Sequence, residues 1–300
     1  MSMLVFEDDF FREEERNGFI VSEMMKHAWA AELEVLAQVS AICERHGLIY
    51  YADYGTMLGA VRHGGFVPWD DDIDIALKRP DYMRLLSILQ KELPEYFYIS
   101  SIYTDIHHRH PGAAVMNGHR VVWDEERMQR FHGCPFVCGI DIYPLDGVPR
   151  DPEVLQMQQL LYSAVFDAAQ RYEQLQQTGE LDQYLVQIEE LCQVKFTEQD
   201  PLCGQLCKLA DRIAMMFPET ECGQLTQMTR LVTMDAKFLL EKEWYAGVIQ
   251  MPFENISVNV PVGYQEILAV MYGDWQHPVR ATASHDYPFY KKQMEALGMQ

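Results

Sequence analysis

The segment from Tyr54 to Ile75 ends in an alternation of acidic and apolar residues, Asp72-Ile73-Asp74-Ile75. Residues two apart on a strand point to the same side, so the alternation predicts two carboxylates directed at one point and two isoleucines in a core. Convergent carboxylates repel each other unless a cation lies between them or one is protonated. Such oxygen ligands suit Mg²⁺ or Mn²⁺ together with substrate phosphates. The alternatives are a solvated acidic loop and a strand that shows its polar face to water.

The residues before the acidic run follow the pattern of a strand, a turn and a helix. The apolar stretch 48–52 predicts a buried strand, and 57–61 predicts the start of a short helix. Between them, Gly55 lets the backbone approach a ligand, and Thr56 can cap the helix, whose free amides suit an anion. A plain strand-helix turn would use the same two residues.

A further carboxylate, Asp141, interrupts the short apolar strand predicted over 139–143. An isolated acid in an apolar strand is costly if it is buried without a partner, and a neighbouring metal ion would remove that cost. Asp141 is therefore expected to join Asp72 and Asp74.

The order strand, Gly-Thr, helix, Asp-x-Asp strand and distant third aspartate resembles the nucleotidyltransferase-fold signature. The run GTMLGAVRHGGFVPWDDDIDI is similar to the signature of the LicD family, which is named for phosphocholine transferases and includes fukutin among its relatives. The segments GIDIYPLDGVP and PVGYQEILAVMYGDWQHP continue the resemblance, whereas 151–235 carries no matching motif. The resemblance implies an α+β fold, with a nucleotidyltransferase-like mixed sheet core, surrounding helices and a mostly helical lobe.

The resemblance also implies a reaction. A phospho-alcohol, phosphocholine by default, is moved from a CDP-alcohol such as CDP-choline to a hydroxyl of a cell-surface glycan, teichoic acid or glycolipid precursor, and CMP is released. The alternative is a nucleotidyltransferase that moves NMP from an NTP and releases pyrophosphate. The implied cofactor is Mg²⁺ or Mn²⁺. The residues assigned to metal binding and catalysis are Asp72, Asp74 and Asp141, and those assigned to substrate binding are Gly55, Thr56, Arg62, His63, Arg120 and Trp69.

One departure from the family pattern lies between the second and third acidic sites. LicD-like proteins carry a strand that reads roughly Ala-Lys-x-Arg, and here Ala114-Val115-Met116-Asn117 precedes Gly118-His119-Arg120. The lysine is absent, so Arg120 is the candidate for its phosphate contact from a shifted position. The alternatives are a differently bound donor and a degenerate, non-catalytic site. The histidine-rich loop 107–110 is expected to be exposed rather than a second metal or phosphate site.

Charge and hydropathy exclude several classes of partner. The net charge of −21 argues against nucleic acid and leaves no polybasic segment for anionic lipid. The apolar runs are too short to predict a transmembrane segment, and the N-terminus has no signal-peptide pattern. Seven cysteines predict reduced thiols. A zinc site on the 134/138 and 203/207 pairs is disfavoured because the pairs lie far apart, and 203/207 is expected in a core. We therefore expect a cytoplasmic protein, with peripheral contact at the inner membrane face as a further option.

The sequence predicts a catalytic core over 1–150, a helical lobe over 151–245 and a C-terminal segment over 246–300 that packs back on the core. Residues 1–20 are expected to form a strap or a frayed arm. A long helix is predicted over 22–45, with Ser22 as its N-cap and Gly47 past its end. Ser284-His285-Asp286 are consecutive and therefore cannot form a hydrolase relay. The expected strands are 48–53, 72–77, 96–103, 113–123 and 138–143, 251–262 is expected to be extended, and the expected shorter helices are 80–93 and 263–272.

Overall fold

The computed structural model describes residues 3–234, 237–280 and 287–299, so the Ser-His-Asp triplet lies outside the described residues. The chain divides into two units, and the chain crosses between them more than once. The first unit contains 1–99, 114–142 and 244–300, and the second contains 100–113 and 143–243. The fold is the predicted α+β class with a mixed sheet. The three-part domain division drawn from the sequence stays a prediction.

The sheet has the strand order β3-β4-β7-β6-β5. Strand β3 pairs with β4 in antiparallel register, Ala52 opposite Ile75. Because β4 and β7 are neighbours, residues far apart in the sequence meet at the centre of the sheet. The strand bounds are β3 Tyr50–Ala52, β4 Ile73–Lys78, β5 Tyr98–Ser101, β6 Ala113–Met116 and β7 Gly139–Val148.

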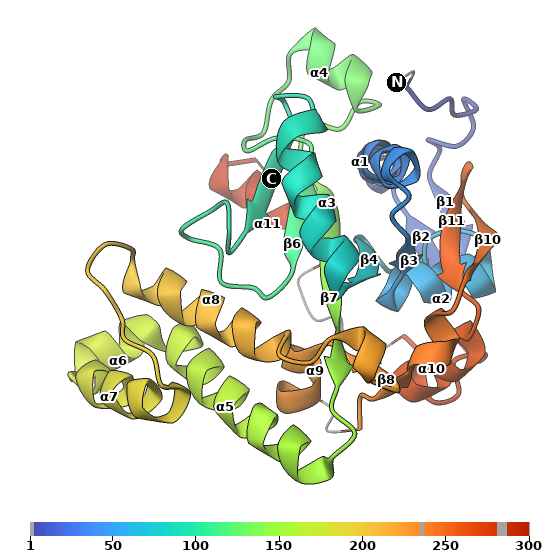
Figure 1. Ribbon diagram of the computed structural model, residues 1–300. Coiled ribbons are helices and arrows are strands. Elements are labelled where there is room, and N and C mark those ends of the chain that lie inside the picture. The colour runs from blue at the N-terminus through green and yellow to red at the C-terminus, as the bar shows by residue number, and fades with distance from the viewer. Residues whose placement is uncertain (1–2, 235–236, 281–286, 300) are drawn as a thin grey trace. The chain divides into compact units, whose positions relative to one another are not determined.

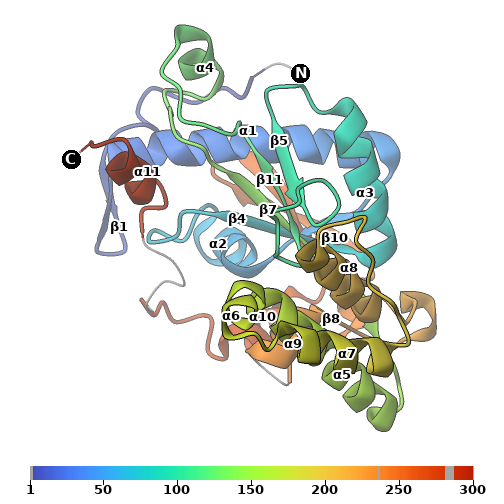
Figure 2. The ribbon, with the colours of Figure 1, turned by 90° about the vertical axis from the view of Figure 1, so that its left-hand side faces the viewer.

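The predicted long helix is α1, Glu23–His46, and its ends are confirmed (Figures 1 and 2). The Ser22 hydroxyl accepts a hydrogen bond from the Met25 amide at 3.3 Å, and Gly47 ends the helix in the left-handed conformation. Helix α1 packs beside α3, and α2 packs against β3 and β4. The other helices here are α2 Tyr54–His63, α3 Arg79–Glu92 and α4 Glu125–Arg130.

Residues 14–21 form a hairpin, where the sequence analysis expected a strap or a frayed arm. Strands β1, Glu14–Arg16, and β2, Phe19–Val21, pair in antiparallel fashion around Asn17-Gly18, whose φ angles are 53° and 75°. Two consecutive positive φ angles are what a two-residue hairpin turn needs, and Asn-Gly supplies them. The Asn-Gly pair was therefore a hairpin signal that the sequence analysis passed over.

The C-terminal residues of the first unit pack against its core. Strands β10, Val248–Phe253, and β11, Ile256–Pro261, form a hairpin, β11 lies against β3, and α10, Tyr264–Tyr272, follows. Near the end of the chain the Phe289 amide donates to the buried Asp71 carboxylate, and Tyr290 stacks on Phe136 with centroids 4.8 Å apart. Helix α11, Lys291–Ala296, carries Gln293, whose amide side chain bonds the backbone of Val137.

The second unit is mostly helical, as the sequence predicts (Figure 1). Helix α5 packs along α8, where the buried Gln158 amide donates to the carbonyl of Ile213 at 2.8 Å. His108 bonds Ser100 and the carbonyl of Gly112, so it holds its own loop. Among the described residues, no helix is both long enough and apolar enough to cross a membrane. The bounds are α5 Pro152–Gln170, α6 Tyr172–Thr178, α7 Leu181–Cys192, α8 Leu202–Ala214, η1 Glu219–Glu221, β8 Gln224–Thr226, α9 Met228–Thr233, β9 Leu240–Glu241 and η2 Lys242–Tyr245.

Candidate active site around Asp74

Asp74 lies inside β4 between two isoleucines that are fully buried, as the alternation predicts. Its side chain is itself only 7% exposed. The strand begins at Ile73, one residue later than expected, so Asp72 is the half-buried residue that leads into it. The acidic run is therefore neither a solvated loop nor the wet face of a strand.

The carboxylates assigned to catalysis gather around Asp74. Burial raises the pKa of Asp74 well above its usual range, and the negative charges of Asp72, Asp141, Asp53 and Asp70 raise it further. Asp141 contributes because β7 lies next to β4 in the sheet. The structure thus brings Asp72, Asp74 and Asp141 together from segments almost seventy residues apart.

Helix α2 begins beside this cluster, and its N-cap is Asp53, so the expectation that Thr56 caps it is wrong. The Asp53 carboxylate accepts from the Tyr54 amide at 2.9 Å. The Thr56 hydroxyl instead accepts from the amide of Asp74 at 2.8 Å, which ties the helix to β4. Gly55 and Thr56 lie in the first turn, where amides have no intrahelical partner and can face an anion.

Position 55 requires a glycine because the Asp70 side chain lies very close to the backbone there. A Cβ atom at this position would lie 1.9 Å from Oδ2 of Asp70. Burial raises the pKa of Asp70, and the charge of Asp72 and a hydrogen bond with it raise that pKa further. The indole of Trp29 donates to the Asp70 carbonyl at 3.1 Å and so holds this loop to α1. Asp70 is therefore part of the acidic cluster.

Two acidic residues of the cluster escaped the sequence analysis. Asp53 is only 2% exposed, and an aspartate just before a helix start is an N-cap signal. Glu32 lies on the buried face of α1, where Oε2 has no hydrogen-bond partner among the residues that the structure describes. Burial raises its pKa well above the usual range, and the charges of Asp71 and Asp72 add to the effect. A glutamate within an apolar helical stripe was the signal for this position.

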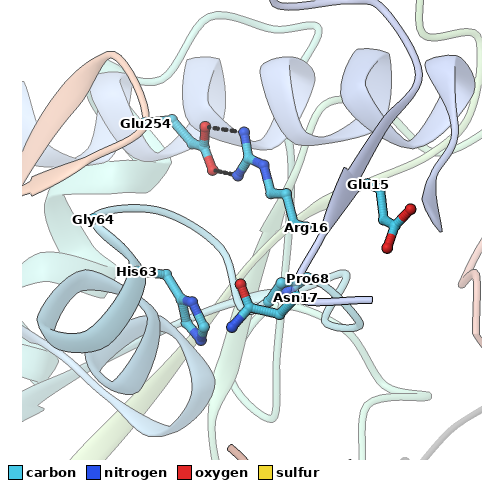
Figure 3. A pocket seen from close by; sticks show the side chains of 7 residues that line it. All are labelled: Glu15, Arg16, Asn17, His63, Gly64, Pro68 and Glu254. Carbon is cyan, nitrogen blue, oxygen red and sulfur yellow. Dashed lines mark hydrogen bonds and ion pairs between the residues drawn. The ribbon is translucent and has the colours of Figure 1, made fainter. Parts of the chain in front are cut away.

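Arg62 and His63 lie at the other end of α2, about 9 Å further along its axis from Thr56 at 1.5 Å per residue. Arg62 donates to the carbonyl of Trp275 at 2.8 Å. His63 lines a separate pocket (Figure 3). The structure does not bring these two side chains to the carboxylates.

The remaining predicted substrate residues lie on loops. The ring of Trp69 meets that of Phe19 edge to face at 6.3 Å, just before the acidic run. Arg120 is exposed in the loop after β6. Their assignment to substrate binding stays a prediction.

A buried arginine stands close to the position of the missing family lysine. The guanidinium of Arg127 donates to the carbonyl of Asn117 at 2.8 Å and to its side-chain oxygen at 3.0 Å. The Asn117 side-chain oxygen also accepts from the amide of Cys138, the residue just before β7. The Arg127 guanidinium is used in these structural hydrogen bonds, so it does not take over a phosphate contact.

Within the described residues, no group of three or more His, Cys, Asp or Glu side chains stands in metal-binding geometry, and the cysteines are free thiols. Mg²⁺ is nevertheless commonly held by one or two carboxylates, with substrate phosphates and water completing its shell. Asp72 and Asp74, within a cluster of mutually repelling acids, fit that donor set.

Residues 47–135 match the family model described as LicD/FKTN/FKRP, nucleotidyltransferase domain. Over 247 residues, the chain is 26% identical to the lipopolysaccharide cholinephosphotransferase LicD of Haemophilus influenzae, a match that covers 81% of this chain and 88% of that protein. These two matches support the LicD family for this chain, and residues 47–135 match its nucleotidyltransferase domain. The model match includes Asp72 and Asp74 and ends before Asp141, so only the longer match reaches β7.

Other relatives share only a short segment with this chain. The human ribitol 5-phosphate transferase FKRP is 38% identical over 48 residues, which is 16% of this chain and 10% of that protein. An uncharacterized protein of Rickettsia prowazekii is 36% identical over 56 residues, or 21% of its length. These short matches support the family and do not extend to the rest of those proteins.

Proposed function

We propose that this LicD-family protein is a metal-dependent phosphotransferase that moves a phospho-alcohol from a CDP-alcohol to an acceptor hydroxyl and releases CMP. Phosphocholine is the default group, because the relative that covers most of the chain is a cholinephosphotransferase. The acceptor is a cell-surface glycan, a teichoic acid or a glycolipid precursor. The observation that carries the proposal is the gathering of three carboxylates: Asp74 on β4, Asp72 just before that strand, and Asp141 on the neighbouring β7.

Asp72 and Asp74 would hold Mg²⁺ or Mn²⁺, with Asp141 beside them. When bound, the ion neutralises charge on the donor pyrophosphate as the leaving group departs. The raised pKa of Asp74, caused by burial and by its acidic neighbours, supports this assignment, because a cation would offset the same repulsion. A chain with net charge −21 is also expected to accept an anionic nucleotide most readily as a metal complex.

The residues of the chain supply positioning and proton transfer. The first-turn amides of α2 at Gly55 and Thr56 bind a phosphate oxygen. Asp141 accepts the proton of the acceptor hydroxyl, whose oxygen bonds to the phosphorus that carries the alcohol. The bond from that phosphorus to the CMP oxygen breaks, and CMP leaves. Trp69 and Arg120 stay proposed donor contacts, and the proposal includes a cytoplasmic location beside a membrane-bound acceptor.

The test is a thermal-shift panel with Mg²⁺ or Mn²⁺ and CDP-choline, CDP-glycerol, CDP-ribitol, CTP, ATP or UTP, followed by an assay for CMP and pyrophosphate. A ligand at about 100 times its Kd stabilises the native state by about 2.7 kcal/mol. We expect a metal-dependent shift with one CDP-alcohol, and CMP release that Asp72→Asn abolishes. Asp211→Asn is the matched control, because Asp211 is a buried carboxylate of the second unit that accepts from the Tyr103 hydroxyl.

A shift with an NTP alone, together with pyrophosphate release, would replace the proposal by nucleotidyl transfer. Absence of any shift and of any product would make the protein a degenerate member of its family. CMP release that is indifferent to EDTA would contradict the metal assignment while leaving the reaction class in place.

A further inference from the structure

A pocket of about 430 Å³ lies at the C-terminal end of α2, where His63 and Gly64 line it (Figure 3). Gly55 and Thr56 lie in the first turn of the same helix. Its size is within the range of small-molecule sites. The proposed reaction has given it no role. The residues that line it are Glu15, Arg16, Asn17, His63, Gly64, Pro68 and Glu254.

One wall of the pocket is an ion pair. The Arg16 guanidinium contacts both carboxylate oxygens of Glu254, at 2.6 and 3.0 Å. Glu254 is only 7% exposed and also accepts from the amide of Phe66 at 3.1 Å. A Cβ atom at Gly65 would lie 2.2 Å from the same carboxylate, so the loop is built around it. The two charges offset each other, and the wall offers hydrogen bonds without a net charge.

A second wall presents a hydrogen-bond donor. Nε of Arg62 donates to Nε2 of His63 at 3.0 Å, so the proton of the neutral ring is assigned to Nδ1. Burial lowers the pKa of His63, and the positive charges of Arg62 and Arg16 lower it further. The ring is therefore neutral at pH 7, and within the described residues its Nδ1 makes no hydrogen bond.

Asn17 completes the polar lining from the hairpin turn. Its φ of 53° sets the turn, and its amide extends toward His63 below the ion pair (Figure 3). Across the described part of the chain, this amide forms no hydrogen bond with another residue. Asn17 thus offers both a donor and an acceptor beside the imidazole.

The lining selects the class of ligand. Glu15 and Glu254 outweigh Arg16 in charge, so a phosphate is disfavoured, and Pro68 is the main apolar contact, so an acyl chain is disfavoured. We propose that this pocket binds a neutral sugar ring through hydrogen bonds to Asn17 and His63. The chemistry has two sources within the proposed function on which it rests, namely the ribose of the donor and a saccharide unit of the acceptor.

Ligand-observed saturation-transfer NMR on the full chain tests the proposal, with cytidine in one arm and D-glucose, D-galactose and N-acetyl-D-glucosamine in the other. The variants are Asn17→Gly, which tolerates the positive φ and removes the amide, and His63→Phe, which keeps a flat ring and removes the donor. Each lost hydrogen bond should weaken binding about fivefold. Ile20→Ala is the matched control, because Ile20 lies on the same hairpin, is 63% exposed and does not line the pocket.

Saturation transfer to a hexose that both variants weaken supports an acceptor subsite, and transfer to cytidine alone that both weaken supports the donor ribose. No transfer to any probe, or transfer that the variants leave unchanged, overturns the proposal. Failure of the proposed reaction is seen separately, as absence of CMP release by the unsubstituted protein. A protein that releases CMP and binds no sugar at this pocket refutes the pocket alone.

Discussion

The acidic cluster should destabilise the folded protein when no cation is present, and Asp74→Asn tests this. Asparagine has the size of aspartate and removes one charge from a buried group that faces four other carboxylates. At an effective dielectric constant of 20, two unit charges about 6 Å apart repel by about 3 kcal/mol. The change also removes the cost of burying an ionised carboxylate.

We expect Asp74→Asn to raise the free energy of unfolding by about 2 kcal/mol in EDTA, because neighbouring carboxyls partly protonate and relieve some of the repulsion. For a chain of this size, that corresponds to a rise in Tm of about 4 °C. The same variant should lose CMP release. Stability gained where activity is lost is common at sites that evolution has kept strained.

The pKa of Asp74 also predicts how the stability of the protein changes with pH. The raised pKa of Asp74 means that the folded state holds this proton more tightly than the unfolded chain, so the stability of the unsubstituted protein falls as pH rises above the unfolded value of about 3.9. The advantage of Asp74→Asn should therefore grow between pH 5 and pH 8, as differential scanning calorimetry in EDTA would show.

A lower Tm for Asp74→Asn in EDTA, or an unchanged Tm at pH 8, would show that charge repulsion at Asp74 does not destabilise the folded protein. Asp211→Asn is the control for the loss of a buried charge as such. Its carboxylate accepts from the Tyr103 hydroxyl, so this change should lower Tm. A rise in both variants would show a general effect of removing negative charge.

Three further changes test other parts of the site. Gly55→Ala should displace the Asp70 carboxyl, because the new Cβ would lie 1.9 Å from it; CMP release should fall at least about tenfold, equivalent to about 1.4 kcal/mol, while calorimetry shows little change in Tm. Glu32→Gln should raise Tm at pH 8 and not at pH 4, because burial raises the pKa of this carboxyl and the penalty exists only when it ionises; equal effects at both pH values in thermal melts would contradict this. Arg127→Met should cost about 3 kcal/mol in chemical denaturation, because it leaves the buried Asn117 carbonyl without this donor and removes one of the two donors to the Asn117 side-chain oxygen; a loss below about 1 kcal/mol would show that the guanidinium is dispensable.

Local pattern was enough to predict the elements that carry the site. The alternation around Asp74 predicted β4 and its buried isoleucines, and Ser22 with Gly47 predicted the ends of α1, because periodicity and capping act over a few residues. The Asn17-Gly18 turn was equally readable, and its neglect left the β1–β2 hairpin unpredicted.

The acidic residues themselves were visible in the sequence, and so was the family pattern that suggested three of them would act together. Tertiary structure alone decided which other acids join them. Asp53 reaches the cluster as the N-cap of α2, Asp70 lies in a loop that packs against Gly55, and Glu32 lies on the buried face of α1. No spacing in the sequence specifies these contacts.

Tertiary structure also determined which site each end of α2 meets. Sequence places Thr56 and His63 on one short helix, yet rigidity over that length keeps its two ends apart, so Thr56 meets the carboxylates and His63 meets the hairpin pocket. The amino-acid sequence determined which chemical groups this protein has and the local elements that carry them. Strand order and helix packing determined which of those groups act together, because burial and charge depend on neighbours that are distant in the chain.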